Sequence, residues 1–145
     1  MAFISQKLVE LIERHADELT KDWLHDVHKN SGMPTCRNCE TEKLFDQTFS
    51  VFDQLSKWIS RDERTKADIS RTYLALGRQR RAEGIPLSEV LQGLILAKRR
   101  LWLKVLSDGI LDTALGLHQA LELNNRVVLF FDRAIFYTTV GYEES

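Results

Sequence analysis

The stretch LGRQRRAEGIPLSEVLQG, from Leu76 to Gly93, decides the fold, because two helical patterns meet inside it. Gly84 suits the left-handed backbone conformation that ends a helix, and Pro86 follows where a helix cannot continue. The stretch therefore predicts a tight corner between two helices. Its dense arginines raise a second question, namely whether the corner also binds an anion.

Stripes of apolar residues at helical spacing extend from this corner in both directions, and no segment alternates as a strand does. The spacing predicts five helices, at about residues 5–29, 41–60, 65–83, 87–107 and 112–140. Apolar residues cover more than half of the circumference of the fourth helix. This predicts that it is the central, most buried helix. The expected fold is all-α, a single-domain helical bundle over residues 1–145. Glycines inside these helices predict close helix contacts, at Gly77, Gly93 and Gly116.

The composition excludes several classes of protein. A chain of 145 residues suits one domain with one core. Its formal net charge of −1 argues against nucleic-acid binding, which needs a basic surplus on at least one face. No apolar run reaches the length of a membrane span, and charges begin too early for a signal peptide. Two cysteines are too few for a secreted disulfide framework, so a cytoplasmic location is expected.

The segment TCRNCE holds Cys36 and Cys39 in a C-x2-C pair, and His25 and His28 lie shortly before it. Four ligands of these types can close a tetrahedral zinc site, and histidines three residues apart share one helix face. The cysteines could instead form a redox dithiol, or be two loop thiols without chemistry. A c-type haem is excluded, because Glu40 stands where that motif needs a histidine.

Two further histidines, His15 and His118, lie near the apolar stripes of the first and fifth helices. A histidine buried in a helical protein raises the possibility of haem ligation. The favoured interpretation is a core histidine satisfied by one hydrogen bond, so no cofactor is expected.

Basic residues cluster on both sides of the corner. Because the corner brings the third and fourth helices together, these charges could share a surface that binds an anionic ligand or an acidic partner. The alternative is a solvated face that neighbouring carboxylates such as Glu83 and Glu89 balance. The cluster comprises Arg78, Arg80, Arg81, Lys98, Arg99, Arg100 and Lys104.

The fifth predicted helix carries a heptad seam, which is typical of a helix that pairs with another helix. Asn124 lies within the seam, where a polar residue can define register and oligomeric state. The seam predicts that this helix forms a dimer contact and transmits the output. Its members are Leu117, Leu121, Asn124, Val128, Phe131 and Ile135.

Motifs of catalysis are missing from the sequence. It holds no P-loop, nucleophile elbow, metalloprotease motif or dinucleotide-binding fingerprint, and no pair of carboxylates stands out as an acid–base dyad. We therefore predict no catalytic residue, and a protein that is not an enzyme.

The segment YLALGRQRRAEGIPLSEVLQGLILAKRRLW, residues 73–102, resembles the N-terminal domain of RsbT co-antagonist RsbRD proteins. The final FFDRAIFYTTVGYEE resembles the last helix of that family, and LIERHADELTKDWL, which contains Trp23, resembles its first. The residues that carry the central similarity are Leu76-Gly77, Arg80-Arg81-Ala82, Gly84-Ile85-Pro86-Leu87 and Arg99-Arg100-Leu101-Trp102.

The resemblance implies an all-α sensory or regulatory domain of stress signalling, which in that family precedes an output module such as a STAS domain or a histidine kinase. The related RsbR N-terminal domains are globin-like, bind no haem and dimerise, so a globin-like dimer is expected here. The sequence ends at Ser145 without an output module, which predicts either a free-standing protein or part of a longer one. The cysteine loop is not a feature of the family.

The leading hypothesis is a non-enzymatic signalling module that acts through helix-mediated protein contact, as a homodimer and on a regulatory partner such as a STAS-domain protein or a kinase. The alternative is a small-ligand or metal-binding helical protein, which holds zinc through Cys36 and Cys39, or haem.

Overall fold

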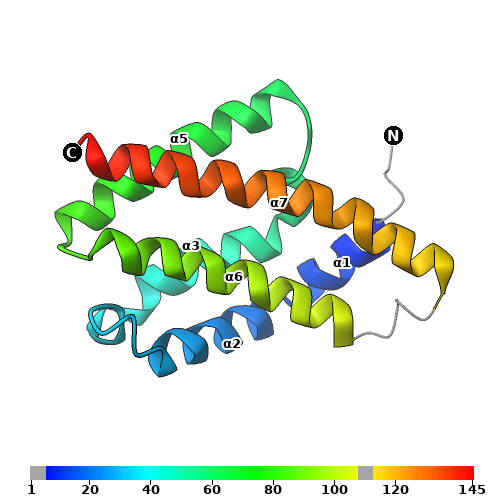
Figure 1. The fold of residues 1–145 in the computed structure, drawn as a ribbon, viewed down its shortest axis with the longest axis horizontal. Helices are drawn as coiled ribbons and strands as arrows, with labels where there is room; N and C mark the ends of the chain where they lie inside the picture. The colour runs from blue at the N-terminus through cyan, green and yellow to red at the C-terminus, as the bar shows by residue number, and fades with distance from the viewer. Residues whose placement is uncertain (1–5, 108–112) are drawn as a thin grey trace.

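The computed structural model describes residues 6–107 and 113–145, and this part of the chain is all-α with no strand (Figure 1). The predicted all-α fold is confirmed. The elements, in chain order, are α1 (Gln6–Arg14), α2 (Ala16–Lys29), the 3-10 turn η1 (Cys36–Asn38), α3 (Thr41–Asp53), α4 (Leu55–Trp58), α5 (Glu63–Ala82), α6 (Leu87–Ser107) and α7 (Ala114–Glu143). None of these helices is both long and apolar enough to cross a membrane.

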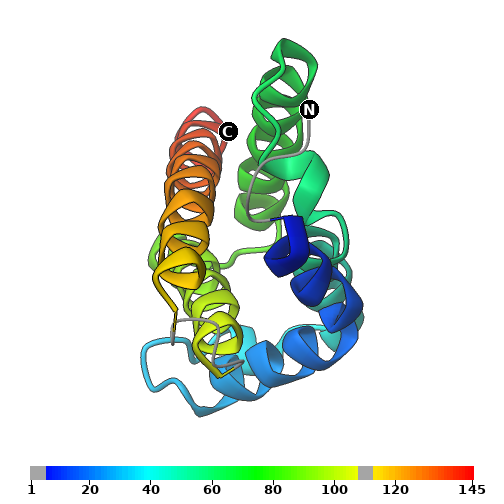
Figure 2. The ribbon, with the colours of Figure 1, turned by 90° about the vertical axis from the view of Figure 1, so that its right-hand side faces the viewer.

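Helices α6 and α7 lie side by side across the front of Figure 1 and run in opposite directions. Helix α5 packs along α7 in the most extensive contact between any two elements of the described chain. In the side view of Figure 2, α1 lies across the interior from α7, and α2 closes the bottom of the molecule. The buried apolar side chains of all these helices form one cluster between them.

The predicted corner at Gly84 is confirmed. Gly84 has a φ of 76°, in the left-handed region, and the amide of Ile85 donates to the carbonyl of Arg80 across 3.1 Å. This bond satisfies a carbonyl that the end of α5 would otherwise leave unpaired. The hydroxyl of Tyr142, in the last turn of α7, donates to the carbonyl of Ile85 across 2.7 Å. The corner is thus fastened to the C-terminal end of α7.

Two of the predicted helices are each broken into two, so the prediction of five helices was too low. The first breaks at His15, whose ring Nδ1 lies 2.9 Å from the carbonyl oxygen of Leu11 and replaces the regular backbone donor. The second breaks at Gln54, where the indole of Trp58 donates to the carbonyl of Ser50 across 3.1 Å. At His15 a side chain thus replaces the backbone donor of a helical carbonyl, which apolar periodicity does not report.

The helix starts differ from prediction at α7. Thr113 caps this helix by accepting a hydrogen bond from the amide of Gly116 across 2.9 Å, one residue after the predicted start at about residue 112. Asp112 itself and Ser5, at which the first predicted helix begins, lie outside the described residues.

Helix α6 is less buried than its composition predicted. It lies at the front of the molecule, and its outward side exposes Ile95, Leu103 and Leu106. The centre of the core is instead an aromatic cluster, in which the rings of Tyr73 and Phe130 meet edge to face with centroids 5.8 Å apart. Trp58 packs against both of these rings.

The contact of α5 with α7 depends on two glycines. A Cβ atom on Gly77 would lie 2.1 Å from the carbonyl oxygen of Thr138, and one on Gly141 would lie 2.2 Å from that of Leu74. Because both obstacles are backbone atoms of a packed helix, no side chain can enter without separating the helices. The predicted close contact at Gly77 is confirmed, whereas a Cβ on Gly93 would meet only ordinary van der Waals neighbours.

We predict that Gly77→Ala lowers the free energy of unfolding by about 3 kcal/mol, because the added methyl group forces α5 and α7 apart. Urea unfolding followed by circular dichroism measures the loss. The matched control is Gly93→Ala, whose Cβ would lie 3.6 Å from the Trp23 ring. This control is expected to leave stability unchanged or slightly higher, and equal losses in the two variants would contradict the close contact.

Candidate functional site

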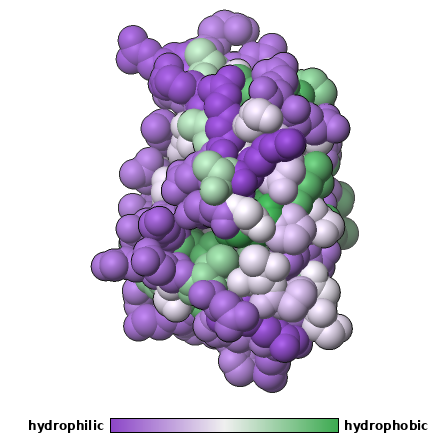
Figure 3. Space-filling model, turned by 90° about the vertical axis from the view of Figure 1, so that its left-hand side faces the viewer, coloured by the Kyte–Doolittle hydropathy of each residue, from purple (hydrophilic) through white to green (hydrophobic). Residues whose placement is uncertain are grey.

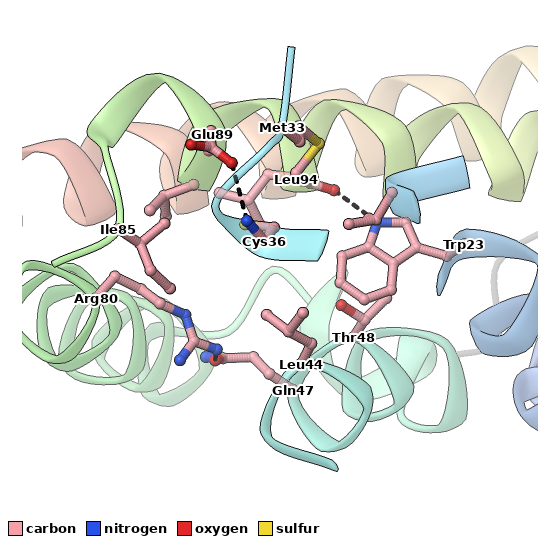
Figure 4. Close-up of a pocket in the computed structure, with 13 residues that line it drawn as sticks. Trp23, Met33, Cys36, Leu44, Gln47, Thr48, Arg80, Ile85, Glu89 and Leu94 are labelled. Atoms are coloured by element: carbon pink, nitrogen blue, oxygen red, sulfur yellow. Dashed lines mark hydrogen bonds between the residues drawn. The ribbon is translucent and has the colours of Figure 1, made fainter. Parts of the chain in front are cut away.

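A cavity of about 50 Å³ lies where α2, α3, α5 and α6 converge, beside the loop that carries η1 (Figure 4). Its wall is mostly apolar, but polar groups from α3, α5 and α6 interrupt it. The lining residues are Trp23, Val27, Met33, Cys36, Leu44, Gln47, Thr48, Arg80, Ile85, Glu89, Val90, Gly93 and Leu94. A mostly apolar cavity with a few convergent polar groups is the usual form of a small-molecule site.

Glu89, in the first turn of α6, is a buried carboxylate with only 3% of its surface exposed. Its Oε1 accepts hydrogen bonds from the amides of Thr35 and Cys36, at 2.9 and 3.0 Å. Figure 4 shows the bond to Cys36 at the rim of the cavity. These two bonds hold the η1 loop against α6, so one side chain forms this wall of the site.

Trp23 closes the opposite end of the cavity. Its indole Nε1 donates to the carbonyl of Gly93 across 2.9 Å, and the side chain of Met33 packs nearby with only 1% of its surface exposed. Because its polar atom is satisfied by α6, the Trp23 ring presents an apolar face to the cavity.

Cys36 contributes a thiol to the cavity wall and is itself buried. Burial raises the pKa of this thiol to about 12, with smaller contributions from Cys39 and Glu89. The group is therefore neutral near pH 7 and behaves as a small apolar side chain.

Arg80 lines the cavity from α5, and only 5% of its surface is exposed. Its guanidinium donates to Oε1 of Glu83 across 2.7 Å and to Oε1 of Gln47 across 3.1 Å. The second oxygen of Glu83 lies 3.5 Å from the Nζ of Lys43, on α3. The buried arginine is thus neutralised by a carboxylate that two cations share.

The other predicted basic residues do not gather around Arg80. Arg78 and Arg99 are exposed, and Arg81 turns outward to stack over the ring of Tyr142 and donate to its carbonyl across 3.1 Å. Arg100 instead binds Asp26 on α2 through a bidentate ion pair, with its NH2 group 2.7 Å from Oδ1. The residues of the predicted basic cluster therefore lie at separate places in the structure. Of these residues, only Arg80 lines the cavity.

The four predicted zinc ligands are not brought together. His25 and His28 are exposed on α2, whereas Cys36 is buried in the cavity wall and Cys39 is half-buried beside it. Within residues 6–107 and 113–145, no three His, Cys, Asp or Glu side chains gather as metal ligands would. The redox dithiol and the absence of a cofactor stay predictions.

The two remaining histidines differ in their surroundings. His15 is half-buried and its ring bonds to the backbone of its own helix, as expected of a core histidine with one partner. His118 is exposed on the first half of α7.

The predicted seam of α7 lies along the border between the core and the surface. Phe131 is fully buried in the core, Asn124, Val128 and Ile135 are half-buried, and Leu117 and Leu121 are exposed. The exposed row of the helix meets this seam at Leu121 and continues through Asn125, Leu129, Asp132 and Phe136.

Sequence reasoning missed Glu89, Trp23 and Tyr142 as residues that build the site and its surroundings. Their hydrogen-bond partners lie 53 to 70 residues away along the chain, so no local spacing connects them. For Glu89, the available signal was a carboxylate at a buried position of the helical stripe that follows Pro86.

We predict that iodoacetamide at pH 8 alkylates Cys36 roughly 100-fold more slowly than a free thiol, because the raised pKa and burial suppress its thiolate. Glu89→Ala removes the acceptor of two amides, costs about 1–3 kcal/mol and speeds the alkylation of Cys36. Peptide mass spectrometry over a time course measures both rates. Glu89→Gln keeps an accepting oxygen and is the matched control; fast Cys36 labelling in the unmodified protein would contradict the structure.

The family model described as the RsbT co-antagonist protein rsbRD N-terminal domain matches residues 40–145. This range contains the corner and the last helix, which carried the resemblance, while the similarity at residues 11–24 lies outside it. No curated protein and no solved structure matches the chain, so the globin-like likeness stays a prediction. Because the match covers most of the sequence, including the corner, Arg80 and Glu89 of the cavity, the chain belongs to the RsbT co-antagonist RsbRD N-terminal domain family.

Proposed function

We propose that the protein is a non-catalytic regulatory module of stress signalling that works as a homodimer, with the outer side of α7 as its contact surface. Family membership supports the regulatory role. The observation that carries the dimer is the row of large apolar side chains that α7 exposes. Leu121, Leu129 and Phe136 have exposed fractions of 56%, 42% and 60%.

This apolar row is broader than α7 alone. Exposed Ile95 and Leu106 lie on the neighbouring antiparallel helix α6, whereas Leu103 of that helix lines a hollow with α2. Figure 3 views the molecule from the end that holds the corner, and apolar side chains line its right-hand edge, where the front of Figure 1 lies. Exposed large apolar side chains that gather on one part of a surface mark interaction sites.

A second copy of the same chain suits this surface better than an unrelated helix. A two-fold dimer brings one patch against itself, so a straight helix of 30 residues with apolar side chains along its length is self-complementary. The half-buried Asn124 and the exposed Asn125 lie near its middle. Amide side chains at such a position pair across a two-fold axis and favour one register.

The C-terminal end of α7 is the proposed output. Arg81 and Ile85 at the corner both bond to Tyr142, so a change at the corner moves the last turn of this helix. A regulatory partner, such as a STAS-domain protein or a kinase, would read that change through a helix that continues or docks there.

The proposal of a non-catalytic role is supported by how the charged groups of the cavity are used. Oε1 of Glu89 accepts from two backbone amides, and Arg80 binds a carboxylate and an amide oxygen. The Cys36 thiol is neutral because its pKa is about 12. These groups are used to hold the fold, and none is poised as a base or nucleophile.

We predict that the double variant Leu129→Glu, Phe136→Glu weakens the dimer by roughly 100-fold or more, because burying unpaired carboxylates is costly. Analytical ultracentrifugation over a concentration series measures the dissociation constant. Ala67→Glu, at an exposed position of α5, is the matched control and leaves the dimer intact. A monomeric unmodified protein, or equal weakening in the control, would rule out the proposed surface.

We further expect Asn124→Leu to change the oligomeric state or its stability, because it replaces the polar residue that selects one register. Native mass spectrometry combined with thermal unfolding detects either effect. If both the mass and the melting temperature match those of the unmodified protein, Asn124 has no part in the contact.

A further inference from the structure

We propose that the cavity bounded by Trp23 and Arg80 binds a small carboxylic acid, whose carboxylate takes the place of Glu83 on Arg80 and Lys43. Its short apolar chain would then occupy the cavity. This site supplies an input to the regulatory role proposed above, but its binding does not depend on the dimer.

The position of the carboxylate is defined by Glu83, which already occupies it. Glu83 places one oxygen 2.7 Å from NH1 of Arg80 and the other 3.5 Å from Nζ of Lys43. Its side chain remains 25% exposed and lies at the C-cap of α5. An incoming carboxylate can make the same two ion pairs, so Glu83 is an internal competitor that can swing out into water.

Arg80 is placed to link this carboxylate position with the cavity. It lines the cavity and also two open surface hollows, both of which Lys43 lines as well. In Figure 4, Arg80 extends toward Gln47 along one side of the enclosed space, with Leu44 and Ile85 close by. In Figure 3, apolar side chains lie at the bottom of a hollow in the otherwise hydrophilic surface of this end. A ligand can therefore enter with its charged end outermost.

The cavity sets the size and polarity of the rest of the ligand. It measures about 50 Å³, and by the same measure one water-sized group needs roughly 10–15 Å³, so about three to five non-hydrogen atoms fit. The faces of Trp23, Val27 and Leu94 make this space apolar. Three to five carbons attached to a carboxylate describe a short-chain fatty acid such as butyrate.

A cationic ligand suits the site poorly. The Arg80 guanidinium and the Lys43 ammonium both stand at the carboxylate position. The buried carboxylate of Glu89 already accepts two amide hydrogen bonds at one oxygen. An amine would therefore enter against two positive charges.

Displacement of Glu83 acts directly on the corner. Glu83 precedes Gly84, and the backbone bond from Ile85 to Arg80 spans both residues. The carbonyl of Ile85 is the acceptor for Tyr142 on α7. One short segment of backbone therefore connects the proposed ligand position with the C-terminal end of α7.

The test is a titration of the full chain, labelled with 15N, with sodium butyrate, followed by heteronuclear NMR at constant ionic strength. The reporter is the indole N–H of Trp23, which donates to Gly93 at the wall of the cavity. Saturable shifts of this resonance and of the Ile85 amide are expected with butyrate, and weaker ones with 1-butanol. No saturable shift with butyrate, or an equal response to butylamine, would overturn the proposal.

Variants distinguish binding at the carboxylate position from nonspecific apolar binding in the cavity. Glu83→Gln removes the internal competitor and is expected to tighten butyrate binding roughly fivefold, whereas Lys43→Gln weakens it by a similar factor. Glu42→Gln, exposed on the same helix as Lys43, is the matched control and changes nothing. Glu83→Gln keeps a side-chain oxygen that can accept from the buried Arg80, and Lys43 is more than half exposed, so circular dichroism is expected to show both variants folded. Unchanged or weaker binding in Glu83→Gln would overturn the exchange of carboxylates, and the NMR readout is the same for monomer and dimer.

Discussion

The close approach of α5 and α7 is the constraint on which the rest of the structure depends. Gly77 and Gly141 bring the two backbones together until no Cβ fits between them, and the aromatic cluster around Tyr73 and Phe130 packs beside this contact. The other helices complete the core against this pair and against α6. Since α7 buries one side on α5, its opposite side is the one left to face water or a partner.

Two consecutive arginines before the corner point in opposite directions, one into the interior and one to the surface. Arg80 points inward to Glu83 and Gln47, while Arg81 points outward to Tyr142. The short turn that follows them is held from both sides, by a buried ion pair and by the last turn of α7. A chemical change on either side therefore reaches the other through very few bonds, which is the arrangement that a regulatory module requires.

The fold class, the corner and the extent of α6 follow from apolar periodicity and from Gly84 and Pro86. The breaks at His15 and Gln54 do not, because the apolar spacing continues across both, and at His15 a ring nitrogen bonds to a nearby helical carbonyl. The cavity could be predicted even less from local patterns in the sequence. Glu89 reads as one surface charge among many until the η1 loop folds back to meet it, and Arg80 reads as part of a basic run until the fold buries it.

The pairing of α5 with α7 also has a consequence for synthesis of the chain. Its contacts join Gly77 to Thr138 and Ile85 to Tyr142, so they cannot form until nearly all of α7 has left the ribosome. Until then, α1 to α6 wait with their apolar faces uncovered, in the state in which nascent domains aggregate or recruit chaperones. The most extensive contact of the described chain thus joins segments far apart in the sequence, and contacts of this kind slow the search for the folded state.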